Sequence, residues 1–249
     1  MKVNPGDVVL LVSTDESYLV KAEAKTINTN SGLIELGKLV GKAYGSFVKT
    51  HLGKKFFLVK PTLLDLMRKL LKRAPQVILP KDASLILAHT GVRRDSLILD
   101  AGSGSGFLAI FLAYYLPQSK VVTYEKRKDF YRVVKKNVKL LGLTNIEVKN
   151  KDVLQGFDES NADLITLDMK DAEKAIKHAY NSLAHGGWLV VYSPYIEQVL
   201  KVKREIEKRR FTQIRIVEAV EREWKFEKYT RPSTLGIMHT GFLTFARKV

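Results

Sequence analysis

A glycine-rich loop near the middle of the chain constrains the fold more than any other segment. Residues 100–106 read Asp-Ala-Gly-Ser-Gly-Ser-Gly, after the apolar run of residues 96–99 and before the apolar, helix-patterned residues 107–113. A strand, a tight turn and a helix in this order are typical of a loop that binds a nucleotide-like cofactor. Glycines let the backbone turn sharply and approach the ligand, and the free N–H groups of the helix favour an anionic group.

The spacing of these glycines points to one cofactor class. Gly102, Gly104 and Gly106 form G-x-G-x-G, whereas a dinucleotide-binding loop has G-x-G-x-x-G, and Phe107 occupies the place of its last glycine. With Asp100 before the first glycine, the loop resembles motif I of the class I S-adenosylmethionine (SAM) methyltransferases. That resemblance implies SAM as the cofactor.

An acidic residue follows each of three further predicted strands. Glu125 comes about twenty residues after the loop, where a carboxylate can bind both ribose hydroxyls; the alternative is an ordinary solvated carboxylate. Asp152 is predicted to accept a hydrogen bond from the adenine N6 amino group or, alternatively, to cap a turn. Asp168 enters the same crevice at the carboxyl ends of the strands, so we predict that it carries the chemistry. The strands are predicted at residues 120–124, 146–148 and 162–167.

Alternating strands and helices predict the α/β fold class with a doubly wound, mostly parallel sheet. We predict helices at residues 129–141 and 172–183, and a fifth strand at residues 188–192. Residues 214–217 and 240–245 then alternate as strands without a long helix between them, which predicts an antiparallel hairpin at the sheet edge. This pair fits the seven-stranded, Rossmann-like methyltransferase fold better than a six-stranded dinucleotide fold.

The first 74 residues have a different pattern of apolar and turn residues from the rest of the chain. Short apolar runs separated by turn residues, with almost no helical period, predict a small β-barrel or β-meander. A helix with an apolar stripe and a basic end is predicted at residues 61–72. We therefore expect an N-terminal β-rich domain, residues 1–74, and a catalytic domain, residues 75–249. The β-runs are residues 7–12, 17–20, 32–36 and 55–59.

The net charge predicts a polyanionic partner. The chain carries 42 Lys and Arg against 26 Asp and Glu, a net charge of +16, and residues 1–74 alone carry thirteen against six. A charge-rich thermophile surface is the alternative, but its mixed networks would be near neutral. A β module beside a catalytic domain favours RNA, with the N-terminal domain binding it. The candidate phosphate contacts are Lys54, Lys55, Arg209 and Arg210.

The cysteine and histidine content and the length of the apolar stretches exclude several kinds of site and of protein. The chain has no cysteine, which excludes disulfides and thiolate metal sites, and its five histidines show no metal-ligand spacing, so no metal is predicted. No apolar stretch approaches the length of a membrane span and no signal peptide is recognisable, so no membrane partner is predicted and the cytoplasm is the expected location.

Several segments together resemble one family over nearly the whole chain. Before the glycine loop stands QVILPKDASLIL, residues 76–87; after it come YEKR, residues 124–127, and LDMKDAEKAIKHA, residues 167–179. The chain closes with RPSTLGIMHTGFLTFARK, residues 231–248, in which H-T-G precedes the last strand. In this order the segments resemble the tRNA (adenine-N1)-methyltransferases of archaea and bacteria.

The resemblance implies a homotetramer that methylates N1 of an adenine in the tRNA T-loop, at position 58 and, in archaeal members, also at position 57. It implies that Asp168 is catalytic and that Leu79 closes over the cofactor. Members commonly continue this aspartate as D-L-P-x-P, whereas this chain has Asp-Met-Lys-Asp-Ala, without proline. By this resemblance the cofactor site comprises Leu79, Asp100, Gly102, Ser103, Gly104, Ser105, Gly106, Glu125, Lys126, Asp152 and Val153.

Three residues are candidates for contact with the target base. Tyr192 and Tyr195, at the end of the fifth strand, either stack on an extruded adenine or pack beneath the cofactor domain, and His239 either approaches the base or packs. Two other functions stay open. One is a SAM methyltransferase for a protein carboxylate or a small tetrapyrrole-like metabolite, which the basic excess in the two segments that flank the cofactor domain, residues 1–74 and 201–231, disfavours. The other is a non-catalytic tRNA-binding subunit, which would be expected to lose the glycines or Asp168.

Overall fold

The structure is a computed structural model of the 249-residue chain, in which residues 1–73, 77–226, 229–234 and 238–249 are described. The chain divides into two compact units, Met1–Leu71 and Lys72–Val249. The predicted domain boundary at residues 74 and 75 and the first residue of the segment before the glycine loop, Gln76, lie outside the described residues.

The N-terminal unit is built from short antiparallel strands. Four of them form a sheet in the order β2-β1-β6-β5, and β3 pairs with β4 in a separate hairpin. The sequence prediction missed β3 and β5, since each is short and β3 is polar. Side chains from the sheet and the hairpin share one hydrophobic core, whose buried members include Leu11, Ile34, Phe56 and Leu58. The strands are β1 Val8–Val12, β2 Ser17–Lys21, β3 Thr26–Thr29, β4 Gly32–Glu35, β5 Phe47–Lys49 and β6 Lys55–Val59, with a 3-10 turn, η1, at Leu36–Leu39.

Helix α1, Leu63–Lys69, closes this unit and is shorter than the predicted helix over residues 61–72. Its start is set by a capping box in which the Asp65 N–H donates to the Thr62 hydroxyl and the Thr62 N–H donates to the Asp65 carboxylate. These two bonds satisfy backbone donors that a helix end otherwise leaves unpaired. Residues 61 and 62 therefore lie before the helix and not within it.

The second unit contains the seven-stranded sheet that the sequence predicts, in the order β12-β15-β11-β10-β7-β8-β9. The five strands from β11 to β9 are parallel to one another, and β15 is antiparallel to both of its neighbours, β11 and β12. β7 is the first strand of this sheet along the chain, and it lies inside the sheet between β10 and β8. The carboxyl ends of the parallel strands all lie at the same edge of the sheet. The strands are β7 Leu97–Ala101, β8 Lys120–Tyr124, β9 Ile146–Lys149, β10 Ala162–Leu167, β11 Leu183–Ser193, β12 Phe211–Glu218 and β15 Phe242–Lys248.

The terminal strand pair corrects the predicted hairpin. β12 and β15 do pair antiparallel, but β15 lies between β12 and β11, and residues 219–241 join the two strands. Within that segment β13, Trp224–Lys225, pairs with β14, Arg231–Pro232. Insertion into the sheet buries Leu243 and Phe245 of β15, whereas β12 forms the exposed edge. A tight turn cannot span residues 219–241, so the hairpin prediction is wrong in its connection and right in its pairing.

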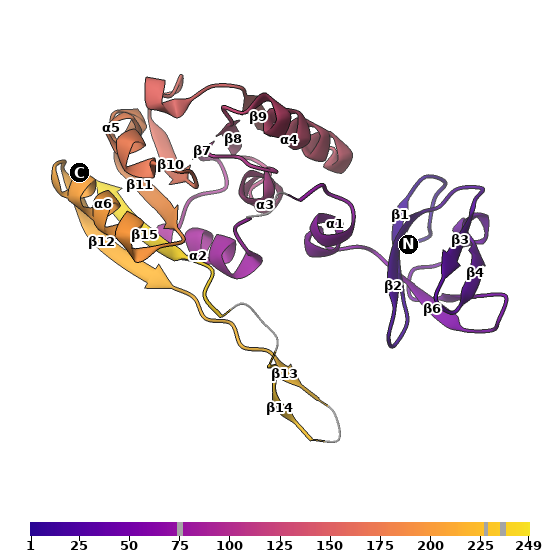
Figure 1. Ribbon diagram of the computed structural model, residues 1–249. Coiled ribbons are helices and arrows are strands. Elements are labelled where there is room, and N and C mark those ends of the chain that lie inside the picture. Colours follow the sequence, from indigo (N-terminus) through magenta and orange to yellow (C-terminus); the bar gives the residue numbers. More distant parts are fainter. Residues whose placement is uncertain (74–76, 227–228, 235–237) are drawn as a thin grey trace. The chain divides into compact units, whose positions relative to one another are not determined.

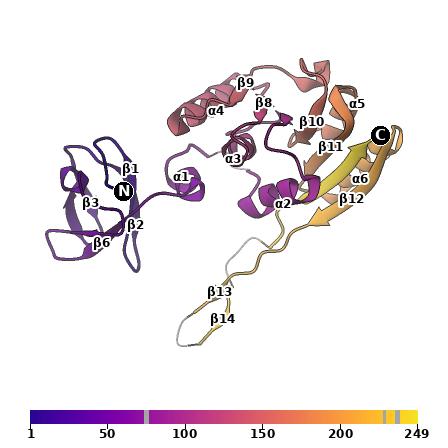
Figure 2. The same ribbon diagram turned by 180° about the vertical axis from the view of Figure 1, so that it is seen from behind.

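Helices cover both faces of the sheet. Figures 1 and 2 show α2, α3 and α4 on one side and α5 and α6 on the other. The second layer buries alanines and isoleucines such as Ala175 and Ile176 against Leu99 and Val191. Among the described residues no helix is long and apolar enough to cross a membrane. The helices are α2 Pro80–Thr90, α3 Phe107–Tyr115, α4 Lys128–Leu141, α5 Ala172–Ser182 and α6 Ile196–Glu207, with a 3-10 turn, η2, at Val153–Gln155.

Candidate active site

The glycine loop folds back over the end of the neighbouring strand. The N–H groups of Gly102 and Ser103 both donate to the carbonyl of Tyr124, at 3.0 and 3.2 Å. Gly102, Gly104 and Gly106 all have positive φ, at 88°, 55° and 82°, a region that favours glycine. Gly106 also caps α3, and a Cβ there would lie 2.9 Å from Val134. The loop thus needs glycine both for its turn and for the close packing of α3 on α4.

A cavity of about 440 Å³ opens beside this loop, at the carboxyl ends of β7, β8 and β10. This volume lies in the range of small-molecule sites. The cavity brings together most of the residues that the sequence assigned to the cofactor and to catalysis. Those in its lining are Asp100, Gly102, Ser103, Gly104, Ser105, Glu125, Lys126, Asp152, Val153 and Asp168.

Two predicted cofactor residues do not line the cavity. Gly106 lies behind it as the cap of α3, and Leu79 lines a different cavity together with Lys81 and Met238. Leu79 is the residue that precedes the first turn of α2, and its neighbours Val77 and Ile78 are the ones that reach the main cavity. The residues of this segment that line the main cavity therefore lie one and two positions before Leu79.

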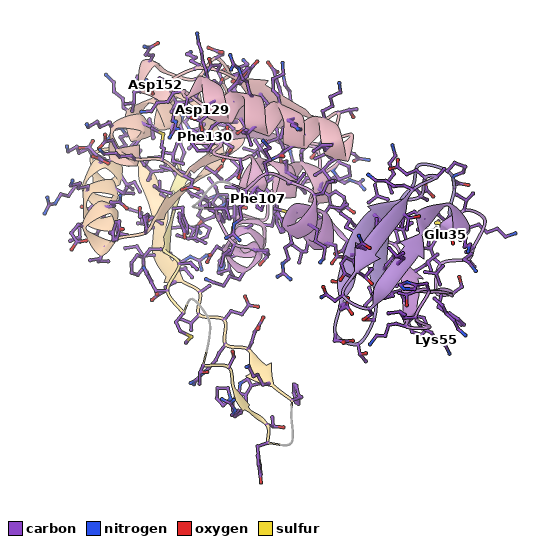
Figure 3. The ribbon with its side chains drawn as sticks, turned by 45° about the vertical axis from the view of Figure 1, so that its right-hand side comes forward. Glu35, Lys55, Phe107, Asp129, Phe130 and Asp152 are labelled. Atoms are coloured by element: carbon purple, nitrogen blue, oxygen red, sulfur yellow. The ribbon has the colours of Figure 1, made fainter. Side chains whose placement is uncertain are left out.

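The apolar and basic side chains in the cavity lining were not predicted from the sequence. Figure 3 labels two of these residues, Phe107 and Phe130, together with Asp152. The Arg127 guanidinium lies 4.2 Å from the centre of the Phe130 ring, a cation–π contact. Their positions in the sequence could have indicated them, because most of these residues are next to a predicted site residue in the chain. The missed residues are Val77, Ile78, Phe107, Leu108, Tyr124, Arg127, Phe130, Lys151, Met169 and Lys170.

Asp100 ties three strands together at the cavity floor. One of its carboxylate oxygens accepts from the Thr123 hydroxyl of β8 at 2.6 Å, and the other accepts from the Thr166 hydroxyl of β10 at 2.7 Å. Burial raises the pKa of Asp100, and the two threonine hydrogen bonds oppose that shift. The residue is 2% exposed, so most of its carboxylate serves the sheet rather than the cavity.

The Glu125 carboxylate is held by backbone donors on both oxygens. Oε2 accepts from the Gly104 N–H and Oε1 from the Arg127 N–H, each at 2.9 Å. An ionised carboxylate has about four acceptor positions, so each oxygen retains capacity for a ligand hydroxyl. The two backbone bonds orient the side chain and link the glycine loop to the end of β8. Glu125 is 7% exposed, which excludes the alternative of an ordinary solvated carboxylate.

Asp152 adopts the turn-capping arrangement that was the alternative prediction for it. Its Oδ1 accepts from the Leu154 N–H at 3.0 Å and so caps η2. Its other oxygen, Oδ2, has no hydrogen-bond partner in the described part of the chain. Because Asp152 also lines the cavity, capping and ligand binding are compatible for this residue.

Asp168 lies directly after β10, against the glycine loop. Its backbone N–H donates to the Ala101 carbonyl at 2.8 Å, which holds the end of β10 beside the end of β7. Burial, and after it the negative charge of Asp100, raise the pKa of Asp168 to about 7. A carboxylate with such a pKa can both accept and release a proton near neutral pH.

The H-T-G segment lies next to the first turn of α2 and is joined to it by buried polar contacts. The Lys81 ammonium lies 2.9 Å from the Asp82 carboxylate and donates to the Thr240 hydroxyl and the Ala219 carbonyl. The Thr240 hydroxyl in turn donates to Asp82 at 2.8 Å. Asp82 is 1% exposed. These contacts, here called the Lys81 clamp, hold both ends of the segment that joins β12 to β15.

The Lys81 clamp reaches one of the predicted base contacts, Tyr192. The Tyr192 hydroxyl donates to the Thr240 carbonyl at 2.5 Å, and a Cβ on Gly241 would lie 2.5 Å from the tyrosine ring. Burial, together with the negative charges of Asp82 and Asp168, raises the pKa of Tyr192 to about 12. Tyr192 therefore packs against the H-T-G segment and does not line the main cavity.

The other two predicted base contacts, His239 and Tyr195, have different surroundings from those of Tyr192. His239 places Nδ1 2.5 Å from the Glu218 carboxylate and Nε2 3.0 Å from the Pro194 carbonyl. The bond to Glu218 and then the Pro194 carbonyl raise the pKa of His239, because both favour the protonated ring. Tyr195 precedes α6 and is 62% exposed. His239 thus bridges three strand ends, whereas Tyr195 is free to contact a large substrate.

The four predicted phosphate contacts fall into two pairs. Lys54 lies 2.9 Å from the Asp15 carboxylate and Arg209 lies 3.2 Å from that of Glu205, so both charges are already paired. Lys55 and Arg210 are exposed and form no ion pair with any described residue. Across the described ranges there is likewise no group of three or more acidic, histidine or cysteine side chains that could hold a metal ion.

Comparison with known families gives one match over most of the chain. The family described as "tRNA methyltransferase complex GCD14 subunit" matches residues 55–234. A curated relative from Methanocaldococcus jannaschii, the tRNA (adenine(57)-N(1)/adenine(58)-N(1))-methyltransferase TrmI, is 32% identical over 96% of this chain and 94% of its own. The tRNA (adenine(58)-N(1))-methyltransferase TrmI of Thermus thermophilus is 29% identical over 98% of this chain and 97% of its own.

Solved structures agree with the fold described above. A SAM-dependent O-methyltransferase from Thermotoga maritima superposes with a TM-score of 0.92 and 32% identity, covering 100% of this chain and 95% of that one. The tRNA (m1A58) methyltransferase TrmI from Aquifex aeolicus superposes with a TM-score of 0.86 over 100% of this chain and 99% of that one. At 24% identity, the second match supports the fold alone.

Proposed function

The chain belongs to the GCD14 tRNA methyltransferase family, and from this premise we propose that it transfers a methyl group from SAM to N1 of an adenine in the tRNA T-loop. The observation that carries the proposal is the position of Asp168. This carboxylate, with a raised pKa, stands at the edge of a cavity lined by the G-x-G-x-G loop and two further strand-end acids. The target is position 58, and the relative from Methanocaldococcus jannaschii supports position 57 as a second target.

The chemistry of the cavity fits SAM. Carboxylates suit the ribose hydroxyls and the amino groups of this cofactor, and the apolar walls suit its adenine ring. The Ser105 hydroxyl lies on the same loop, buried and without a hydrogen-bond partner among the described residues, so a ligand can satisfy it. When bound, SAM supplies a methyl group activated by a sulfonium.

Each predicted cofactor contact is proposed on the geometry of its residue. Glu125 binds the ribose, because its carboxylate is oriented by two backbone donors. Asp152 uses its free oxygen for the adenine amino group. The loop residues Gly102–Ser105, a range that includes the unpaired Ser105 hydroxyl, bind the methionine end. Val77 and Ile78, rather than Leu79, cover the cofactor.

Asp168 acts on the target base. N1 of adenine carries an in-plane lone pair, so no proton has to leave before attack on the methyl group. The ring becomes cationic as the bond from N1 to the methyl carbon forms, while the electrons of the carbon–sulfur bond stay on sulfur. A carboxylate that accepts a hydrogen bond from N6 raises the electron density at N1 and stabilises this charge. Its raised pKa then allows Asp168 to accept the N6 proton.

Recognition of tRNA is proposed for the basic surface. Lys55 in the N-terminal unit and Arg210 in the catalytic unit are two unpaired contributors to it, and Tyr195 is exposed for contact with RNA. We further propose a homotetramer, which the family resemblance implies, and the cytoplasm as its location, since tRNA is the substrate. Light scattering of the purified protein measures the oligomeric state directly.

A second candidate function has one specific observation in its favour. The Thermotoga maritima protein of the same fold is described as an O-methyltransferase and shares 32% of its residues with this chain. A substrate hydroxyl would require a base to remove its proton during attack, a role that Asp168 can also fill. The acceptor atom therefore distinguishes the two candidates, and the fold does not.

The test is product mapping, together with a comparison of the parent and the Asp168→Asn variant. The protein is incubated with labelled SAM and unmodified tRNA, and the methylated nucleotide is identified by digestion and mass spectrometry. We expect N1-methyladenosine from the T-loop, and a decrease in single-turnover rate of about 100-fold or more for Asp168→Asn, with tRNA and SAM affinity retained. Ribose or carboxylate methylation overturns the proposed acceptor, and a rate for Asp168→Asn within about threefold of the parent overturns the role of Asp168.

A further inference from the structure

Two phenylalanines face each other on the outer surface of the N-terminal sheet. Phe47 of β5 and Phe57 of β6 are directly opposed in the antiparallel register, with ring centroids 6.1 Å apart and an interplanar angle of 69°. The rings are 40% and 48% exposed, whereas Val48 and Phe56, which alternate with them, are buried. Strand alternation therefore places both rings on the solvent side of the sheet by register and not by chance.

Two lysines share this face with the rings. Lys49 and Lys55 are the next opposed pair in the register, two residues along each strand from Phe47 and Phe57. The Lys55 ammonium lies 4.8 Å from the centre of the Phe47 ring, and Lys55 is labelled on the N-terminal unit in Figure 3. The face thus presents two aromatic rings beside two exposed cations, here called the Phe47–Phe57 platform.

The residue composition of the platform indicates which kind of partner it binds. Protein interfaces are depleted of lysine at their centres, whereas sheets that bind single-stranded RNA combine exposed aromatic rings, which stack on bases, with nearby cations that bind phosphates. Two like charges directly opposed across strands destabilise a sheet unless an anion is bound, and Lys49 faces Lys55 in this way. The unit as a whole, residues 1–71, carries eleven Lys and Arg against six Asp and Glu.

We propose that the Phe47–Phe57 platform stacks an unpaired base of the substrate tRNA, while Lys49 and Lys55 bind the adjoining phosphates. The proposal rests on the proposed function for its RNA partner. It goes beyond that function, because it assigns the N-terminal unit a stacking contact with a nucleotide in addition to general electrostatic attraction. The contact lies wholly within one unit, so it requires no particular arrangement of the two units.

The test separates stacking from charge by their different salt dependence. Equilibrium affinity for unmodified tRNA is measured from about 50 to 300 mM salt for the parent, Phe47→Leu/Phe57→Leu and Lys49→Ala/Lys55→Ala. Loss of the rings should weaken binding about 5- to 100-fold by the same factor at every salt concentration, since stacking is not ionic. Loss of the lysines should instead reduce the salt slope by about 1.4 to 1.8.

Controls distinguish the platform from general damage. Phe47→Tyr/Phe57→Tyr keeps the rings and should retain the parent affinity, and Leu52→Ala removes a side chain of the same unit that is 71% exposed and should change nothing. Full tRNA affinity for the leucine variant overturns the proposal, as does a change in oligomeric state at unchanged tRNA affinity, which would assign the face to a second copy of the chain. Failure of the proposed function would show separately, as a parent protein that does not methylate tRNA.

Discussion

Gly102 and Asp168 are in such close contact that a Cβ on the glycine would lie 2.0 Å from the aspartate carbonyl oxygen. The contact joins the start of the glycine loop to the proposed catalytic residue, which are 66 positions apart in the chain. No side chain can be accommodated there unless the end of β10 moves away from the loop.

Gly102→Ala should therefore impair both stability and the site. The clash is with backbone, and the φ of 88° is unfavourable for alanine, so we expect a loss of about 2–4 kcal/mol in unfolding free energy and at least about tenfold weaker SAM binding. Denaturant unfolding and calorimetry measure the two effects. Gly142→Ala is the control, because Gly142 also has positive φ but has open space around it, so only about 1 kcal/mol should be lost, with SAM affinity intact.

The pH dependence of the reaction should report Asp168. Its pKa is raised to about 7, so the carboxylate is protonated at lower pH and cannot accept the hydrogen bond or the proton from N6. The value of kcat/KM should rise with pH through a midpoint near 7 and level off about one unit above that midpoint. A positive charge from the bound cofactor favours the ionised carboxylate, so the midpoint for kcat should lie lower than that for kcat/KM. A profile that is flat from pH 5 to 9, a range of about two units on each side of that pKa, would contradict the assignment.

Glu125→Ala should weaken SAM binding by about 1.5–3 kcal/mol, the scale of lost charge-assisted hydrogen bonds. The loss includes direct contacts to the ribose and the orientation of the loop, since Gly104 and Arg127 also lose their acceptor. Isothermal titration calorimetry measures the change. Glu147→Ala, on the next strand but in an exposed ion pair with Lys120, should leave SAM affinity unchanged. Equal affinities for the parent and Glu125→Ala would remove Glu125 from the ribose role.

The basic residues should contribute unequally to tRNA binding. Lys55→Ala/Arg210→Ala removes two unpaired cations and should reduce the slope of log affinity against log salt by about 1.4 to 1.8. Lys54→Ala/Arg209→Ala removes the same formal charge, but each of these cations is already paired with a carboxylate, so a smaller change in slope is expected. Filter binding over a salt series compares the two double variants. Identical slopes would show that ion pairing within the protein does not decide which cations bind RNA.

The Lys81 clamp should be important for stability because its charges are buried. Lys81→Met leaves the Asp82 carboxylate without a counter-charge, which should cost about 3–5 kcal/mol of unfolding free energy. Lys81→Met/Asp82→Leu removes both charges and should recover part of that loss. Lys208→Met breaks an exposed pair with Glu205 and should cost less than about 1 kcal/mol. If Lys81→Met is as mild as this control, the clamp does not hold the H-T-G segment.

The order of strands and helices could be predicted from sequence because its signals are local. Glycine spacing, apolar runs of strand length and helical periodicity each act over a few residues, and the rule that parallel strands share their carboxyl ends places Asp100, Glu125, Asp152 and Asp168 together. The connection between β12 and β15 could not be predicted this way. Nothing local shows that the last strand inserts beside β11 and leaves the earlier strand at the edge.

The chemical state of the site depended on the tertiary structure. The sequence by itself determined which residue types stand at the strand ends, and with them the class of cofactor and the candidate catalytic carboxylate. Only folding decided that Asp168 is partly buried near Asp100, which raises its pKa to about 7, and that Lys81 meets Thr240 across 159 positions. The physical reason is that desolvation and electrostatic interaction depend on distance in space, and residues far apart in the chain come within reach only when the sheet and its helices assemble.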